Sequence, residues 1–155
     1  MNKSERGLDK AGIRLIATGD VTDDDQLNDM GDVALGVINS HHYSAAHPSA
    51  TNERFVDACQ AANKFRPNFM AVGGYDGMRV IYNALNATKG QGGEALLNAM
   101  KGQIFESPRG QVLIDAQTRD IVQDIYIRKV ERINGQLWNV EFDVQRAVKD
   151  PGKLK

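Results

Sequence analysis

The stretch RPNFMAVGGYDGMRVIYNAL, residues 66–85, decides the expected fold because apolar side chains recur in it at helical spacing. Pro67 opens the stretch, and proline is common in the first turn of a helix. One face of the predicted helix carries Met70, Gly74, Met78, Ile81, Tyr82 and Leu85. The sequence therefore predicts an amphipathic helix here, with this face turned toward other parts of the protein.

A group of glycines, Gly73, Gly74 and Gly77, flanks Tyr75 and Asp76 inside this helix. Each glycine costs a helix about 1 kcal/mol relative to alanine. Such a group therefore indicates that another backbone, or a ligand, approaches the helix closely. Tight packing against another element is the favoured interpretation, and the approach of a ligand is the alternative.

Short apolar runs alternate with helical patterns through residues 13–100. Strands are predicted at residues 13–17 and 33–39, and further helices at residues 22–30, 51–64 and 94–100. Such alternation is typical of an α/β layer with parallel strands.

The tail changes to strands, which are predicted at residues 112–114, 121–133 and 136–144. Asn134 and Gly135 between the last two strands are a strong signal for a two-residue hairpin turn, which sets the pairing. The expected pairs are Ile133 with Gln136, Ile127 with Phe142 and Ile125 with Val144. The apolar members of these pairs, with Val140, form the predicted buried face; Asp124, Arg128, Asn139, Glu141 and Asp143 form the predicted solvent face.

Length and composition bound the classes of function. The chain has 155 residues, 41% hydrophobic and 25% charged, with a formal net charge of −1. These values are ordinary for one globular domain and give no basic surface for nucleic acid. No window approaches the ~20 apolar residues of a membrane helix. Residues 1–10 lack the apolar core of a signal peptide, so the chain as it stands is expected to stay in the cytoplasm.

Metal-binding patterns are incomplete. The acidic run at residues 20–29 lacks the glycine and the glutamate that a calcium loop needs at its sixth and twelfth positions. His41, His42 and His47 lie close in sequence, but no second group of Cys or His accompanies them. On a strand, His41 and His42 would point to opposite faces, so at most one could face a cleft. We interpret them as hinge residues and expect no metal.

Catalytic patterns are also missing. Residues 90–93 lack the Gly-Lys-Ser/Thr of a phosphate loop. Cys59 lies at helical spacing between apolar residues, and we interpret it as a small buried core residue. We therefore expect no catalysis and no cofactor, with a small α/β enzyme as an alternative.

Several segments, taken in order, resemble the type I periplasmic binding proteins, which are the solute receptors of ABC importers. Residues 71–78, AVGGYDGM, resemble the start of a cleft-lining helix, and residues 12–20, GIRLIATGD, resemble a strand that ends in a Gly-acidic turn. Residues 33–43 resemble the strand that crosses between the lobes, residues 52–58 the helix after it, and residues 110–150 the closing strands. The branch most similar is that of the leucine/isoleucine/valine-binding protein.

The resemblance covers only the C-terminal portion of such a receptor. It implies a partial type I fold, with the end of one lobe at residues 1–32, part of the other lobe at 33–108, and strands that return to the first lobe at 109–155. It also implies a periplasmic location and a membrane permease as partner in the full-length protein.

The resemblance further implies where a solute binds. In this family the Gly-acidic turn supplies a carboxylate for the ammonium group of the ligand, and Asp20 matches that position. Tyr75, from the opposite lobe, matches an aromatic position that lines the cleft, and Asp76 beside it is a second candidate. The alternatives are a capping carboxylate for Asp20 and a core tyrosine for Tyr75. Expected ligands are branched-chain or related amino acids, amides or small carboxylates.

A partial receptor leaves apolar faces and sheet edges uncovered. We therefore expect the chain to form a homodimer, through exposed elements or by exchange of the hairpin. Two alternative functions stay open: a ligand-sensing regulatory module of the same fold, and a truncated remnant without present function.

Overall fold

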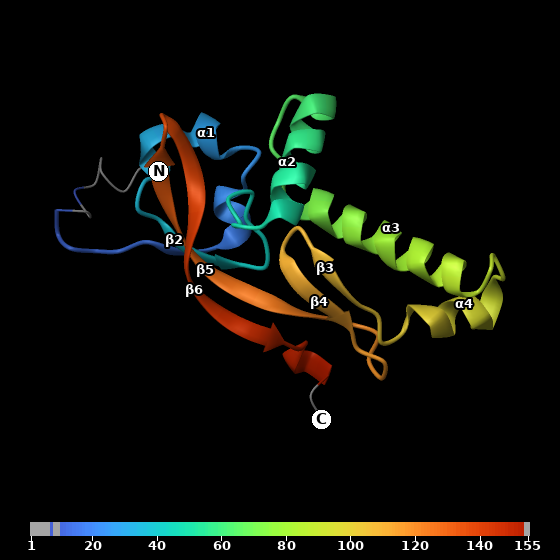
Figure 1. Ribbon diagram of the computed structural model, residues 1–155. Coiled ribbons are helices and arrows are strands. Elements are labelled where there is room, and N and C mark those ends of the chain that lie inside the picture. Colours follow the sequence, from blue (N-terminus) through green and yellow to red (C-terminus); the bar gives the residue numbers. More distant parts are fainter. Residues whose placement is uncertain (1–6, 8–9, 154–155) are drawn as a thin grey trace.

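One mixed sheet runs through the computed structural model, which describes residue 7 and residues 10–153 (Figure 1). Its strands follow the order β1-β2-β5-β4-β3, and β6 pairs with β5. The strands are β1 (Ile16–Thr18), β2 (Ile38–His41), β3 (Ile104–Ser107), β4 (Gly110–Ile114), β5 (Ile121–Ile133) and β6 (Gln136–Val148). β1 and β2 are parallel, and the other pairs among the described strands are antiparallel. The predicted α/β class with a C-terminal hairpin is therefore confirmed.

The helices lie close to their predicted positions, with one exception. They are α1 (Leu27–Met30), α2 (Ala50–Asn63), α3 (Phe69–Ala87) and α4 (Gly93–Met100), with short 3-10 turns η1 (Gly19–Thr22), η2 (Gly31–Ala34) and η3 (Pro151–Lys153). In place of the helix predicted at residues 22–30, the structure has the shorter helix α1. Thr22, expected to cap that helix, is buried and donates its hydroxyl to Asn139 Oδ1 instead, at 3.1 Å.

The strand predicted at 33–39 begins later, at Ile38. Gly36 explains the delay, because its φ of 76° interrupts the extended backbone. Its amide nevertheless donates to the carbonyl of Val130 at 2.9 Å, so the turn is fastened to β5. β3, at Ile104–Ser107, was not predicted from the sequence.

The hairpin keeps the predicted register near its turn, where Ile133 faces Gln136. An irregularity between Ile127 and Arg128 then shifts the pairing. Beyond it, Ile127 faces Asp143 and Ile125 faces Gln145, in place of the predicted Phe142 and Val144. The extra residue of a β-bulge produces such a shift.

The predicted buried face of the hairpin is wrong. Arg128 and Asn139 are 1% and 0% exposed, whereas Phe142 is 58% exposed. The face with polar residues is buried because these side chains find hydrogen-bond partners in distant segments, described below. Val130 and Leu137, on the same face, join the hydrophobic core with Leu27 of α1.

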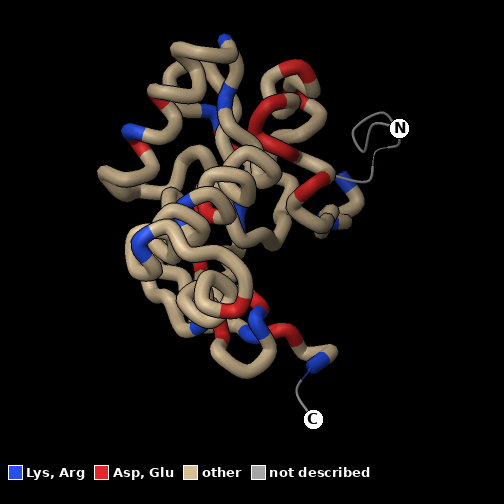
Figure 2. Tube along the Cα trace, turned by 90° about the vertical axis from the view of Figure 1, so that its right-hand side faces the viewer, with Lys and Arg blue, Asp and Glu red and all other residues tan. Residues whose placement is uncertain are grey.

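The ribbon of β5 and β6 connects the two parts of the molecule (Figure 1). At one end it lies with α1, β1 and β2, and toward the other end β5 pairs with β4 near the long α3. Acidic residues gather on the part of the trace nearer the N-terminus (Figure 2), which contains the acidic run from Asp20 to Asp25.

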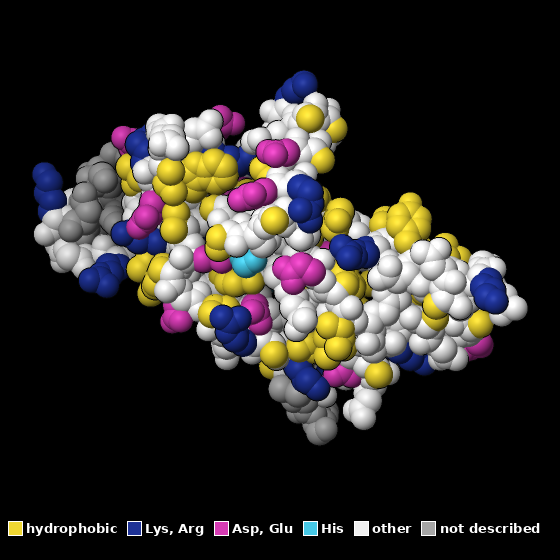
Figure 3. Space-filling view, viewed as in Figure 1, with side chains coloured by type: hydrophobic (Ala, Val, Ile, Leu, Met, Phe, Trp, Pro, Cys, Tyr) yellow, Lys and Arg dark blue, Asp and Glu magenta, His cyan; other side chains and the backbone are white. Residues whose placement is uncertain are grey.

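The prediction that the glycine-bearing face of α3, its outer face, packs against another element is wrong. Among the described residues, nothing lies within 4 Å of a Cβ built on Gly73, Gly74 or Gly77. Met70 and Tyr82 on the same face are 68% and 59% exposed. Hydrophobic side chains accordingly reach the surface along α3 (Figure 3). The helix packs by its other face, where Val72, Asp76 and Ala84 are buried.

Candidate functional site

The turn after β1 carries Asp20. Thr18 ends the strand, and the chain enters the 3-10 turn η1 at Gly19. Asp20 is exposed, and its pKa is lowered, chiefly by a hydrogen bond from the Thr18 side chain and to a smaller degree by His41. The carboxylate is therefore ionised and available at a strand end, where open α/β sheets place their ligands.

His41 lies directly against this turn. A Cβ on Gly19 would stand 2.4 Å from the Cβ of His41, a distance that side chains do not adopt. The contact follows from the parallel pairing of β1 with β2, in which Thr18 faces Ser40. The sequence thus needs glycine at position 19 to let the end of β2 approach η1.

His41, His42 and Phe69 form an aromatic cluster beside Asp20. The two imidazole rings stack with centroids 4.3 Å apart, and the Phe69 ring meets them edge-on at 5.0 and 6.0 Å. The prediction that the two histidines point to opposite faces is therefore wrong. β2 ends at His41, so the alternation of a strand no longer applies to His42.

Both imidazoles of the aromatic cluster are neutral near pH 7. Burial lowers the pKa of His41 to about 4, and the nearby Arg128 guanidinium contributes. Burial also lowers the pKa of His42 to about 3, with His41 as the next cause. A neutral imidazole offers one hydrogen-bond donor and one acceptor, together with an aromatic face. Within the described part of the chain, no group of His, Cys, Asp and Glu could hold a metal ion.

A buried polar network lies beneath the turn and the aromatic cluster. Arg128 donates from Nε to Asn39 Oδ1 at 2.6 Å. Asn39 and Asn139 are hydrogen-bonded to each other at 3.1 Å, and Asn139 Nδ2 donates to Asp24 Oδ1 at 3.0 Å. Burial raises the pKa of Asp24 and lowers that of Arg128. The sequence analysis assigned Arg128 to the solvent face, and nothing in the alternation of β5 indicated that this charged residue is buried.

Asp76 lies in a separate buried ion pair. Its Oδ2 accepts hydrogen bonds from Arg109 Nε at 2.7 Å and from Ser107 Oγ at 2.9 Å. Arg109 Nη1 also donates to Gln123 Oε1 at 2.7 Å. Asp76 and Arg109 are 3% and 6% exposed. The carboxylate thus binds α3 to β3 and to the β3–β4 turn, and Arg109 extends the link to β5.

Tyr75 lines a groove of about 610 Å³ between α2 and α3. Its ring centroid lies 5.1 Å from that of Phe55, and the residue is 39% exposed. Cys59 lines the same groove and is half-buried, so its prediction as a buried core residue is wrong. Asp20 lies beside Thr18 and His41, whereas Tyr75 lies in the groove between α2 and α3.

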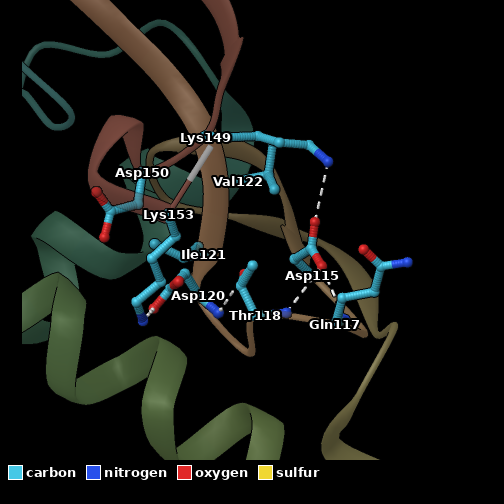
Figure 4. Close-up of a pocket in the computed structure, with 9 residues that line it drawn as sticks. All are labelled: Asp115, Gln117, Thr118, Asp120, Ile121, Val122, Lys149, Asp150 and Lys153. Carbon is cyan, nitrogen blue, oxygen red and sulfur yellow. Dashed lines mark hydrogen bonds and ion pairs between the residues drawn. The ribbon is translucent and has the colours of Figure 1, made fainter. Parts of the chain in front are cut away.

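A further cavity, of about 380 Å³, lies at the end of β6 (Figure 4). Its two lysines point toward its own carboxylates: Lys149 pairs with Asp115 at 3.0 Å and Lys153 with Asp120 at 2.8 Å. These pairs fasten the end of the chain to the turn between β4 and β5. They suit a structural role better than ligand recognition.

Comparison with known proteins agrees with the fold. A family model described as "Periplasmic binding protein" matches residues 3–136. The Leu/Ile/Val-binding protein homolog 6 of Brucella abortus is 40% identical over 152 residues, which are 96% of this chain and 39% of that protein. None of the helices in the described part of the chain has the length and apolarity that a membrane crossing requires.

Two solved structures are similar over almost the whole chain. A solute binding protein of an ABC transporter from Rhodopseudomonas palustris BisB5, in complex with 3,4-dihydroxy benzoic acid, is 59% identical with a TM-score of 0.92. Another from Rhodopseudomonas palustris HaA2, in complex with p-hydroxybenzoic acid, is 34% identical with a TM-score of 0.88. The alignments cover 97% and 98% of this chain but 42% of each of those proteins. The chain thus spans about two fifths of their length.

Proposed function

Since this chain belongs to the periplasmic binding protein family, we propose that it forms part of the solute receptor of an ABC importer, with a membrane permease as its partner. The predicted resemblance to this family is confirmed. The expectation that the chain is not an enzyme agrees with the family as well. A periplasmic location for the complete receptor is part of this proposal.

We propose a hydroxylated aromatic carboxylate as the ligand. One observation carries this choice: two stacked, neutral imidazoles and Phe69 stand beside the ionised Asp20. Aromatic faces bind an aromatic ring by offset or edge-on stacking. The complexes of the two similar proteins with hydroxybenzoic acids support the same class. This choice narrows the predicted range, which also included branched-chain amino acids and amides.

Charge sets the orientation of such a ligand. A benzoate has no ammonium group for Asp20 to bind, and its carboxylate would be repelled by that side chain. A ring hydroxyl, however, can donate a hydrogen bond to Asp20, and such charge-assisted bonds are strong. The proposed pose therefore directs a hydroxyl at Asp20 and the ligand carboxylate away from it.

Tyr75 and Asp76 stay predictions as ligand-side residues. The partial exposure of Tyr75 on α3 supports its prediction. Asp76 already accepts two hydrogen bonds from Arg109 and Ser107. We propose that it acts by holding α3 in place rather than by contacting the solute.

Thermal unfolding against a ligand panel tests the proposal. The panel contains 3,4-dihydroxybenzoate, 4-hydroxybenzoate, benzoate and leucine. A ligand present at 100 times its dissociation constant adds about 2.7 kcal/mol, which is several degrees in the midpoint. We expect the hydroxybenzoates to shift the midpoint and leucine not to shift it. Asp20→Asn should reduce that shift, whereas Asp29→Asn, at an exposed position of α1, should leave it unchanged.

A shift with leucine and none with the hydroxybenzoates would contradict the ligand class. No shift with any member of the panel would contradict the proposed aromatic-carboxylate site in this part of the receptor.

A further inference from the structure

Arg128 is the largest of the fully buried side chains among the described residues, and it reaches from β5 across β2 to the site. Its Nη2 donates to the carbonyl of Gly19 at 3.2 Å, and its Nη1 donates to the carbonyl of Tyr43. Its Nε donates to Asn39 Oδ1 at 2.6 Å. One planar guanidinium thus contacts η1, β2 and the segment that follows β2.

These contact points stand next to the residues proposed to meet the solute. Gly19 immediately precedes Asp20, and Tyr43 immediately follows His42. Asn39 lies two positions before His41 on the same strand. Because a peptide unit is planar, fixing a carbonyl also fixes the direction of the amide that follows it. Arg128 therefore constrains the backbone on both sides of the aromatic cluster.

The electrostatic surroundings suit a positioning role rather than a simple ion pair. Asp24 is the only carboxylate paired with Arg128 among the described residues, at 4.0 Å. Asp24 is itself held by the amide of Ala45 at 3.0 Å and by Asn139. The hydrogen bonds of the guanidinium therefore go to neutral oxygens in fixed positions. A rigid five-donor fork can satisfy such a set, whereas a lysine ammonium cannot match its geometry.

We propose that Arg128 is the positioning residue of the solute site: it ties the Gly19 and Tyr43 carbonyls together and so sets the distance between Asp20 and the paired rings of His41 and His42. Its effect on affinity rests on the proposed function. Its effect on the ligand-free geometry does not.

NMR of the ligand-free chain provides the first test. In Arg128→Lys, we expect the amide signals of Asp20 and Ser44, which follow the two fixed carbonyls, and the ring signals of His41 and His42 to move. Arg128→Met removes the charge as well and should move them further. Val130→Ala is the matched control, since Val130 is 1% exposed on the same face of β5 but belongs to the hydrophobic core. It should lower the thermal midpoint while leaving these signals in place.

Binding of 3,4-dihydroxybenzoate by calorimetry, well below the unfolding midpoints, provides the second test. We expect Arg128→Lys to weaken binding about tenfold or more, the loss expected when a displaced Asp20 no longer makes its charge-assisted hydrogen bond to the ligand hydroxyl. Val130→Ala should bind within about twofold of the unaltered chain. If Val130→Ala moves the Asp20 and histidine signals as far as Arg128→Lys does, or if Arg128→Lys moves none of them, the inference is overturned. An unaltered chain that does not bind refutes the proposed function alone, because the ligand-free NMR comparison still decides the role of Arg128.

Discussion

A Cβ atom on Gly19 would lie 2.4 Å from the Cβ of His41, so the glycine allows the turn after β1 to approach the end of β2 this closely. Gly19→Ala therefore requires the turn that carries Asp20 to move. The φ of Gly19 is not in the left-handed region, so backbone strain adds nothing to the effect. We expect a destabilisation of about 1–3 kcal/mol in urea unfolding, as for an overpacked core, together with weaker solute binding.

Gly73→Ala is the control for that experiment. A Cβ at Gly73 meets nothing within 4 Å among the described residues, and the position is inside α3. Alanine should therefore stabilise the chain by up to about 1 kcal/mol through helix propensity alone. Stabilisation by Gly19→Ala, or equal effects of the two substitutions, would contradict the contact between Gly19 and His41.

The ion pair of Asp76 with Arg109 should contribute strongly to stability. Asp76→Ala leaves the Arg109 guanidinium buried without its carboxylate, and breaking a buried pair in this way costs about 3–5 kcal/mol. Urea unfolding measures the loss. Glu131→Gln, in the exposed pair with Lys129, is the comparison and should cost less than about 1 kcal/mol. Similar losses for the two variants would argue against a structural role for Asp76.

The neutral histidines make stability depend on pH. Their pKa values of about 4 and 3 lie below the ordinary value of 6.5, so below pH 6.5 the unfolded chain binds protons that the folded chain does not. Stability from these rings is therefore full above pH 6.5 and falls as the pH drops toward 4. For each ring, the unfolded chain binds at most about one proton more than the folded chain in this range.

The double variant His41→Gln/His42→Gln isolates that dependence. Burial raises the pKa of Asp23 to about 6, which acts in the opposite direction, but Asp23 is present in both proteins. As the pH falls from 7 to 4, the free energy of unfolding of the unaltered chain should therefore decrease relative to that of the variant. A difference that stays constant over this range would show that the rings titrate normally.

The outer face of α3 should drive self-association. Its exposed residues include Met78 and Tyr82, and the charged residues of α3, Asp76 and Arg79, bond to β3 and to the β3–β4 turn instead. Two copies could therefore meet through this face without opposed charges. We expect a dimer by light scattering at high concentration, and Met78→Lys should weaken it.

The hairpin offers the competing route to a dimer. Ile133→Lys places a charge beside the hairpin turn, where Ile133 is 44% exposed. If this variant dissociates the dimer and Met78→Lys does not, exchange of the hairpin explains association better than α3. A monomer at every concentration would contradict both routes.

Local patterns in the sequence predicted much of the fold. Helical spacing predicted α2 and α3, and the Asn134–Gly135 turn predicted the hairpin. In the structure, Ser49 and Asn68 cap the starts of the two helices. These signals lie within a few residues of the elements that they define. The delay of β2 at Gly36 is also local, but glycine alone does not reveal that its φ is positive.

The buried face of the hairpin could not be predicted in this way. Arg128 is buried because Gly19, Asn39 and Tyr43, about 85 to 109 positions away, supply its acceptors. Amphipathic patterning counts such an arginine as solvent-facing. Of the candidate site, Asp20 was named by family resemblance, whereas His42 and Phe69 entered only through ring contacts that join separate elements.

An NMR titration with 3,4-dihydroxybenzoate tests the central claim most directly. We predict saturable shifts of the His41 and His42 ring protons, with nuclear Overhauser contacts from the ligand ring to Phe69, and no such shifts with leucine at the same concentration. Saturable shifts with leucine at these rings and none with the hydroxybenzoate would contradict an aromatic-acid site. So would ligand contacts confined to the Tyr75 groove.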